Sequence, residues 1–144
     1  MQNPPPVQTS SQPPAPTAKS STGLDENIAA LLSYIAGWIT GLVFFLIEKD
    51  SRLVRFHAMQ SLILIGGGFV VLFALWIFIF VSSLIVAQIS EILSFLLTMV
   101  LGLVAGVIGI AILIGAIIGL VKAYQGQYFK LPVVGNLAEK YSAK

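Results

Sequence analysis

The sequence predicts an all-α membrane protein with three transmembrane helices, a long second hairpin and a short C-terminal interfacial amphipathic helix. Of its 144 residues, 57% are hydrophobic and only 10% are charged, whereas a soluble domain carries about 25% charged residues. Residues 58–121 contain a single charged side chain, Glu91. A soluble fold could not cover its surface with so few charges, so we expect lipid to cover most of it.

The first 23 residues differ in composition from the rest of the chain. They hold six of the seven prolines, with many Gln, Ser and Thr residues and one cation. Such a stretch has little apolar surface to bury, which predicts a disordered tail that is either simply solvated or a ligand for a partner's groove. Residues 24–144 then form the transmembrane domain.

The first predicted span covers residues 28–47. Asp25 suits the N-cap of this helix, because its carboxylate can accept hydrogen bonds from the first free amides. The largely apolar run of 20 residues at 28–47 would span about 30 Å as a helix, which matches the hydrocarbon core of a bilayer.

Two longer apolar runs follow the charged connection at residues 48–57, and we place spans in them at about 58–82 and 97–121. Each run exceeds one bilayer thickness, so the chain could cross there two or three times. Basic residues decide between these alternatives: three lie between residues 48 and 57, and four follow residue 121. The positive-inside rule places both groups in the cytoplasm, which requires two crossings between them.

The excess length is expected at the external end of this second hairpin. Small and polar residues there recur at helical spacing and Glu91 lies beside them; they are Ser83, Ala87, Ser90, Ser94 and Thr98. This segment could lie in the interface or extend the hairpin above it. After Lys122, residues 132–141 predict a short amphipathic foot on the cytoplasmic surface, with Pro132 near its start.

Small residues at four-residue spacing mark the candidate helix-packing positions. They are Ser33, Gly37 and Gly41 in the first span, and Gly102, Gly106, Ala111, Gly115 and Gly119 in the third. Lipid provides little hydrophobic drive for helix association, so close backbone approach has to provide it. These faces could pack within one chain or between copies.

The charged connection holds the candidate contact residues for lipid headgroups or a partner, which are Lys49, Arg52, Arg55 and His57. His57 with Glu48 could also act as a base and an acid, but the spans offer no further catalytic partner. The chain has one histidine and no cysteine, so we expect no metal and no cofactor. Its basic residues form no stripe that could follow nucleic acid.

Three stretches carry a resemblance to a known family. They are GLDENIAALLSYIAGW at 23–38, LIEKDSRLVRFHAMQS at 46–61 and KAYQGQYFKLPVVGNLAEK at 122–140. The chain resembles small prokaryotic membrane proteins of unknown function that are related to the twenty-kilodalton Tic subunit of the chloroplast import translocon, and some magnetosome membrane proteins are similar. The resemblance implies a helical multi-pass fold. The plastid relatives of this family have four spans and are implicated in protein import. The resemblance carries no functional residues over to this chain.

Together these observations predict a non-enzymatic protein of the cytoplasmic (inner) membrane that acts through helix packing and partner association. Its partners are expected to be the lipid bilayer and either further copies of itself or other membrane proteins. The N-terminus is expected outside and the C-terminus in the cytoplasm. The alternative function is a channel or protein-translocation component formed by an oligomer.

Overall fold

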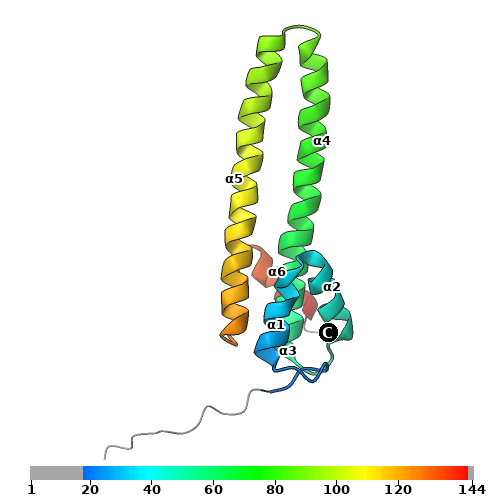
Figure 1. Ribbon diagram of the computed structural model, residues 1–144, viewed down its shortest axis with the longest axis vertical. Coiled ribbons are helices and arrows are strands. Elements are labelled where there is room, and N and C mark those ends of the chain that lie inside the picture. Colours follow the sequence, from blue (N-terminus) through cyan, green and yellow to red (C-terminus); the bar gives the residue numbers. More distant parts are fainter. Residues whose placement is uncertain (1–17, 143–144) are drawn as a thin grey trace, which may run out of the picture.

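The computed structural model describes residues 18–142, in which a long hairpin rises from a base of short helices (Figure 1). In chain order the helices are α1 (Glu26–Ile35), α2 (Trp38–Ile47), α3 (Arg52–Ser61), the π-helical segment η1 (Leu62–Gly67), α4 (Gly68–Ala87), α5 (Glu91–Tyr124) and α6 (Val134–Ser142). We call α1, α2, α3, α6 and the last turns of α5 the base. Most of the predicted tail lies outside the described residues.

Within residues 18–142, two helices are long and apolar enough to cross a membrane. α3, η1 and α4 form one continuous helix, Arg52–Ala87, of 36 residues, and α5 has 34 residues. At 1.5 Å per residue each is about 50 Å long. The predicted spans at 58–82 and 97–121 fall inside these helices, so the prediction of a long helical hairpin is confirmed.

The tip of the hairpin is a short turn between α4 and α5. Ser90 caps α5, since its Oγ accepts a hydrogen bond from the amide of Leu93 at 3.4 Å. The hydroxyls of Ser83 and Ser94 lie 3.0 Å apart, so two members of the predicted small polar face join α4 to α5. Glu91 is the first residue of α5. Its negative charge there interacts favourably with the positive end of the helix dipole.

The predicted first span, residues 28–47, is wrong as a single crossing helix. The chain forms two helices of 10 residues there, α1 and α2, and reverses direction between them at Gly37, whose φ is +66°. The hydroxyl of Thr40 lies 3.2 Å from the amide of Ala36 and 3.2 Å from the carbonyl oxygen of Ser33. The Thr40 hydroxyl thus forms hydrogen bonds with backbone groups that have no helical partner at the break.

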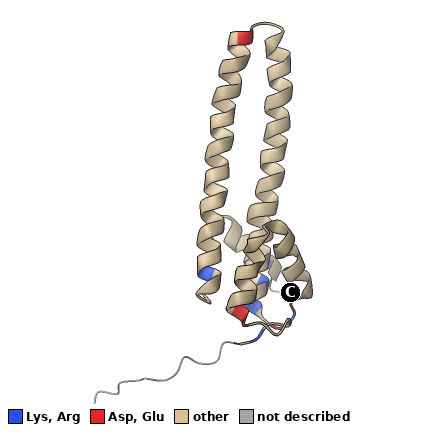
Figure 2. Cartoon of the chain, viewed as in Figure 1, with Lys and Arg blue, Asp and Glu red and all other residues tan. Residues whose placement is uncertain are grey.

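Both ends of this helical pair lie at the same end of the molecule. The amide of Ser21, before α1, donates to the carboxylate of Glu48, after α2, at 3.0 Å. The described N-terminal residues therefore lie beside the basic connection, and Figure 2 shows the Lys and Arg positions (blue) at this end of the molecule. This arrangement does not fit the predicted single crossing of residues 28–47, which would place residues 21 and 48 on opposite sides of a membrane.

Small residues let the helices of the base pack closely. One buried cluster joins α1, α3 and the end of α5, and it consists of Ala29, Ala30, Tyr34, Leu53, Val54 and Ala123. A second cluster, Phe56, Met59 and Ala138, joins α3 to α6. Three of the six residues in the first cluster are alanines, which allow the backbones to approach without a cavity.

The C-terminal foot is present as α6, which begins two residues later than predicted. Gly135 and Ala138 are buried against neighbouring elements, and a Cβ added to Gly135 would lie 2.6 Å from the Cα of Lys130. The larger apolar side chains of Leu137 and Tyr141 are exposed. Val133, just before α6, has a φ of +67°, an unfavourable conformation for a β-branched residue.

Candidate functional site

The three stretches of sequence that carry the family resemblance meet in the base. Ser21 and Glu48 bring the segment before α1 to the connection before α3. Tyr34 of α1 meets His57 of α3, and Gln60 of α3 meets Leu131 in the connection after α5. Their shared location makes the base the candidate functional site, and its polar contacts form two separate clusters.

The first cluster surrounds the carboxylate of Glu48, which is 0% exposed. Its Oε1 accepts hydrogen bonds from the amides of Ser21, Asp50 and Ser51 at 3.0, 3.0 and 2.9 Å. The hydroxyl of Ser21 lies 2.8 Å from the same oxygen. A carboxylate that accepts several amide hydrogen bonds favours its charged form, so Glu48 fastens residues on both sides of the α1–α2 pair.

Ser51 extends this cluster to the next helix. Its Oγ accepts from the amide of Val54 at 3.3 Å and therefore caps α3, and it donates to Glu26 of α1 at 2.9 Å. The carboxylate of the preceding residue, Asp50, accepts a hydrogen bond from the hydroxyl of Ser21 at 2.7 Å. The start of α3 is thus tied to α1 through one serine side chain.

We expect the stability of the base to fall in acid because of Glu48. Burial alone would raise the pKa of Glu48, but hydrogen bonds from Ser51, Ser21 and Asp50 lower it below its ordinary value of 4.5. A depressed folded-state pKa gives stability that is present above the unfolded pKa and lost as pH falls through the folded pKa. The melting temperature in detergent should therefore decline below about pH 4.5.

The variant Glu48→Gln tests this assignment. Its amide nitrogen would face backbone donors, so we expect a loss of about 1–3 kcal/mol at neutral pH, together with a weaker decline in acid. Glu91→Gln at the hairpin tip is the comparison variant and should change both the melting temperature and its acid profile much less, since an exposed charge at a helix start contributes only about 0.3–1 kcal/mol. A Glu48→Gln profile that overlays the wild type would show that this carboxylate does not fasten the base.

The second cluster links Tyr34, His57 and Gln60 in the interior of the base. Nε2 of His57 lies 2.9 Å from the carbonyl oxygen of Gln127, which can only accept, so this nitrogen carries the proton. Nδ1 then accepts from the hydroxyl of Tyr34 at 3.3 Å. The hydroxyl of Tyr34 in turn accepts a hydrogen bond from Nε2 of Gln60 at 3.1 Å. Each group in this row of hydrogen bonds is therefore assigned as donor or acceptor.

Gln60 also holds the connection between α5 and α6. Its Nε2 lies 3.3 Å from the carbonyl oxygen of Phe129, and its Oε1 accepts from the amide of Leu131 at 3.3 Å. Among the described residues, no buried side-chain nitrogen or oxygen is left without a hydrogen-bond partner. The polar interior of the base therefore joins α1, α3 and the 125–131 connection.

The predicted contact residues occupy different environments. His57 is 0% exposed, so the prediction that it contacts lipid headgroups or a partner is wrong; sequence alone did not reveal its partners. Arg55 is half-buried, donating to the carbonyl oxygen of Glu48 at 2.9 Å, and its guanidinium lies 5.1 Å from the Phe45 ring centroid. Lys49 and Arg52 are exposed and remain available to headgroups or a partner.

The structure does not join Glu48 to His57. Their hydrogen bonds belong to the two separate clusters, so the acid and base considered from sequence are not brought together as a pair. In residues 18–142 no group of three or more His, Cys, Asp and Glu side chains could hold a metal ion. The clusters consist of satisfied polar groups that position helices.

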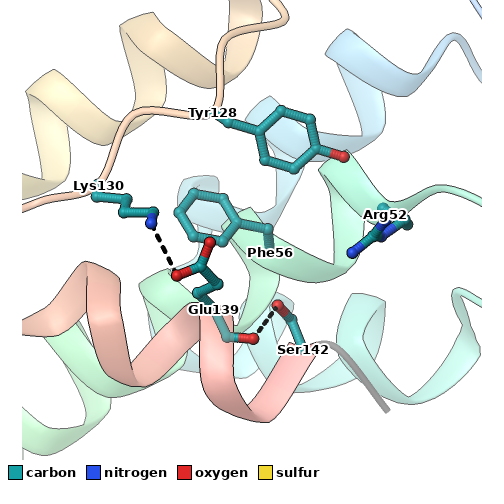
Figure 3. Close-up of a pocket in the computed structure, with 6 residues that line it drawn as sticks. All are labelled: Arg52, Phe56, Tyr128, Lys130, Glu139 and Ser142. Atoms are coloured by element: carbon teal, nitrogen blue, oxygen red, sulfur yellow. Dashed lines mark hydrogen bonds and ion pairs between the residues drawn. The ribbon is translucent and has the colours of Figure 1, made fainter.

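A surface cavity of about 320 Å³ opens beside these clusters. Figure 3 shows its lining, which comes from α3, the connection after α5, and α6: Arg52, Phe56, Tyr128, Lys130, Glu139 and Ser142. Nζ of Lys130 and Oε2 of Glu139 form an ion pair at 2.7 Å. Burial raises the pKa of Tyr128, so its hydroxyl stays protonated at neutral pH and can donate a hydrogen bond.

Some of the candidate packing glycines lie against a neighbouring helix, and others do not. A Cβ on Gly41 would lie 3.0 Å from the carbonyl oxygen of Ala58, and one on Gly119 would lie 2.7 Å from the hydroxyl of Tyr34. Gly37 and Gly115 would meet side chains at 3.3 Å, whereas Gly102 and Gly106 would meet no atom within 4 Å. Ser33 is buried in α1 and bonds the carbonyl oxygen of Ala30 at 2.6 Å. Ala111 lies within the apolar stretch of α5.

A family comparison covers the hairpin and most of the base. Residues 24–138 match the model of the magnetosome magnetite crystal formation protein family. The chain belongs to this family. The match includes both polar clusters apart from Ser21, and the cavity-lining residues up to Lys130, so most of the base described above lies within the matched region.

Archaeal relatives agree with this assignment. A UPF0132 membrane protein of Methanocaldococcus jannaschii is 42% identical over 124 residues, covering 86% of this chain and 94% of the relative. One from Archaeoglobus fulgidus is 36% identical over 117 residues, covering 81% and 95%. No solved structure matches the chain. These findings support the resemblance to small prokaryotic and magnetosome membrane proteins, while the link to the Tic subunit stays a prediction.

Proposed function

We propose that this member of the magnetosome magnetite crystal formation family is a non-enzymatic protein of the cytoplasmic membrane that acts by binding partners through its base. One observation carries this proposal. The side chains that could take part in acid–base or other polar chemistry are already hydrogen-bonded to groups of other segments, which they hold together; they are Glu48, His57 and Gln60. A catalytic group needs a free face toward a substrate. What remains open to a partner is the cavity lined by Arg52, Tyr128 and Lys130.

We also propose that the base lies at the cytoplasmic face, with the α4–α5 hairpin crossing the membrane twice. The described basic residues all belong to the base or its connections, whereas Glu91 begins α5 at the tip (Figure 2). The positive-inside rule then favours a cytoplasmic base. In this topology both the described N-terminal residues and α6 are cytoplasmic, and the predicted interfacial foot lies on the membrane surface.

Site-specific photo-crosslinking in cells tests the proposed partner binding. A photoreactive amino acid at Tyr128, in the cavity, should give discrete protein adducts, either with a second copy or with another protein. The same amino acid at Leu96, which is exposed near the hairpin tip, is the control and should give lipid adducts only. If position 128 yields no protein adduct, the proposal that the base binds partners is wrong.

A channel, as in the Tic-like alternative, has less support. The described residues of α4 and α5 that carry polar side chains are concentrated at the tip, where Ser83 and Ser94 bond each other. Pores are usually lined by polar side chains or free backbone carbonyls. Purified protein in liposomes is therefore expected to conduct no ions, and steady conductance would favour the channel instead.

A further inference from the structure

The thickness of the molecule changes along its length. At the level of the base, α1, α2 and α6 surround α3 and the end of α5, whereas towards the tip α4 and α5 run alone as a two-helix hairpin (Figure 1). Each helix with its side chains is about 10–12 Å across. The cross-sectional area of the molecule is therefore much larger at one end of the hairpin than at the other.

The height of the base can be located on the long helix. The α1–α2 turn packs against η1, because a Cβ on Gly66 would lie 3.1 Å from Cβ of Trp38. The hairpin beyond Gly66, up to Ala87, is about 32 Å long. This length by itself matches a hydrocarbon core of about 30 Å, so a hairpin that crosses the membrane leaves the base in the interfacial region of a single leaflet.

The outer surface of the base is built for lipid. On α2 three residues at helical spacing, Ile39, Val43 and Leu46, are 46–66% exposed, and on α6 the side chains of Leu137 and Tyr141 are exposed as well. Exposed cations at the same end, Lys49 and Arg52, suit a headgroup layer. Apolar surface beside cations identifies the occupant as the acyl chains and anionic headgroups of one leaflet.

We infer that the protein is a wedge that prefers curved membrane, with its base in the leaflet on the convex side. Shallow insertion of amphipathic helices into one leaflet makes membrane binding sensitive to curvature. Adding α1, α2 and α6 to one leaflet enlarges that leaflet's area, and convex bending relieves the mismatch. The inference rests on the proposed placement of the base at one membrane face.

Single-vesicle fluorescence measures this preference directly. Protein labelled at Gln88→Cys is reconstituted into phosphatidylcholine–phosphatidylglycerol vesicles of about 50 to 400 nm in diameter. A membrane-impermeant quencher added outside extinguishes the label of molecules whose tip faces outward, which distinguishes them from molecules with the base outward. The density of base-outward molecules should be at least about threefold higher on the smallest vesicles, and base-inward molecules should show the opposite trend.

Two matched triple variants separate the wedge from general hydrophobicity. Ile39→Ala with Val43→Ala and Leu46→Ala trims the base, whereas Ile77→Ala with Val81→Ala and Leu84→Ala removes the same side chains at the same spacing from α4. Both sets are exposed, so neither should unfold the protein. Only the α2 variant should flatten the dependence on diameter.

The two failures are distinguishable on the same vesicles. Thiol labelling at Thr22→Cys and at Gln88→Cys should occur from opposite sides of the membrane. If both positions label from one side, the proposed placement of the base is wrong and the inference falls with it. If the labels lie on opposite sides but density is independent of diameter, or both triple variants behave alike, the wedge is wrong while the placement stands.

Discussion

Replacing Gly119 by leucine is expected to destabilise the base by about 3 kcal/mol, because overpacking a tight helix contact forces side chains and backbone apart. A Cβ at this position would lie 2.7 Å from the hydroxyl oxygen and 2.8 Å from Cζ of Tyr34. The ring of Tyr34 is only 5% exposed and is hydrogen-bonded to Gln60 and His57. It cannot move aside without breaking the second polar cluster.

Thermal or denaturant unfolding in mild detergent measures this loss, with Gly106→Leu as the matched control. Gly106 lies on the same helix and a Cβ there would meet no atom within 4 Å, so its substitution should change stability little. If the two variants were equally stable, close packing of α1 on α5 would not hold the base. If Gly106→Leu alone were unstable, contacts between copies through this face would matter more than those within the chain.

Replacing Gln60 by leucine is expected to cost about 3 kcal/mol. Leucine has a similar size but can make none of the hydrogen bonds to Tyr34, Phe129 and Leu131. The amide of Leu131 and the carbonyl oxygen of Phe129 would then lose a partner in the interior of the base. Leaving a buried polar group unsatisfied costs about 1–3 kcal/mol.

A double-mutant cycle with Tyr34→Phe tests whether the cluster acts as a unit. Tyr34→Phe removes the hydroxyl that Gln60 and His57 share, so it should cost less than Gln60→Leu. In combination the two changes should cost less than the sum of the single losses, because they break the same hydrogen bond. Strict additivity would mean that the residues stabilise the base independently.

The long hairpin could be predicted from sequence because its signal is local. Between residues 58 and 121 only Glu91 is charged, and two apolar runs on either side of it can form only long helices in lipid. The tip followed from the same reasoning, since the small polar residues around Ser83 and Ser94 lie where α4 and α5 meet. Sequence placed these features because neighbours in the chain decide them.

The reversal at Gly37 could not be predicted from hydropathy. Residues 28–47 have the length and composition of a span whether the chain continues or turns back. A glycine at positive φ, with Thr40 beside it to serve the broken helix ends, decides the outcome. Glycine is common in membrane helices, so its presence in an apolar run does not by itself signal a turn.

The polar clusters were missed because their partners are distant in the chain. The carboxylate of Glu48 accepts a hydrogen bond from the amide of Ser21, and the ring of His57 donates one to the carbonyl oxygen of Gln127. Main-chain groups at such separations leave no pattern in a sequence. The one available signal was the cost of placing Gln60 near the membrane, since a polar side chain there needs a partner.

The distance between spin labels at Thr22→Cys and Lys49→Cys tests the central claim that α1 and α2 return to the side from which they start. The chain contains no cysteine, so the two labels are the only ones present. In lipid we expect a distance below about 20 Å, because residues 21 and 48 are in contact and each nitroxide side chain adds several ångströms. A distance above about 30 Å, the thickness of the hydrocarbon core, would contradict it.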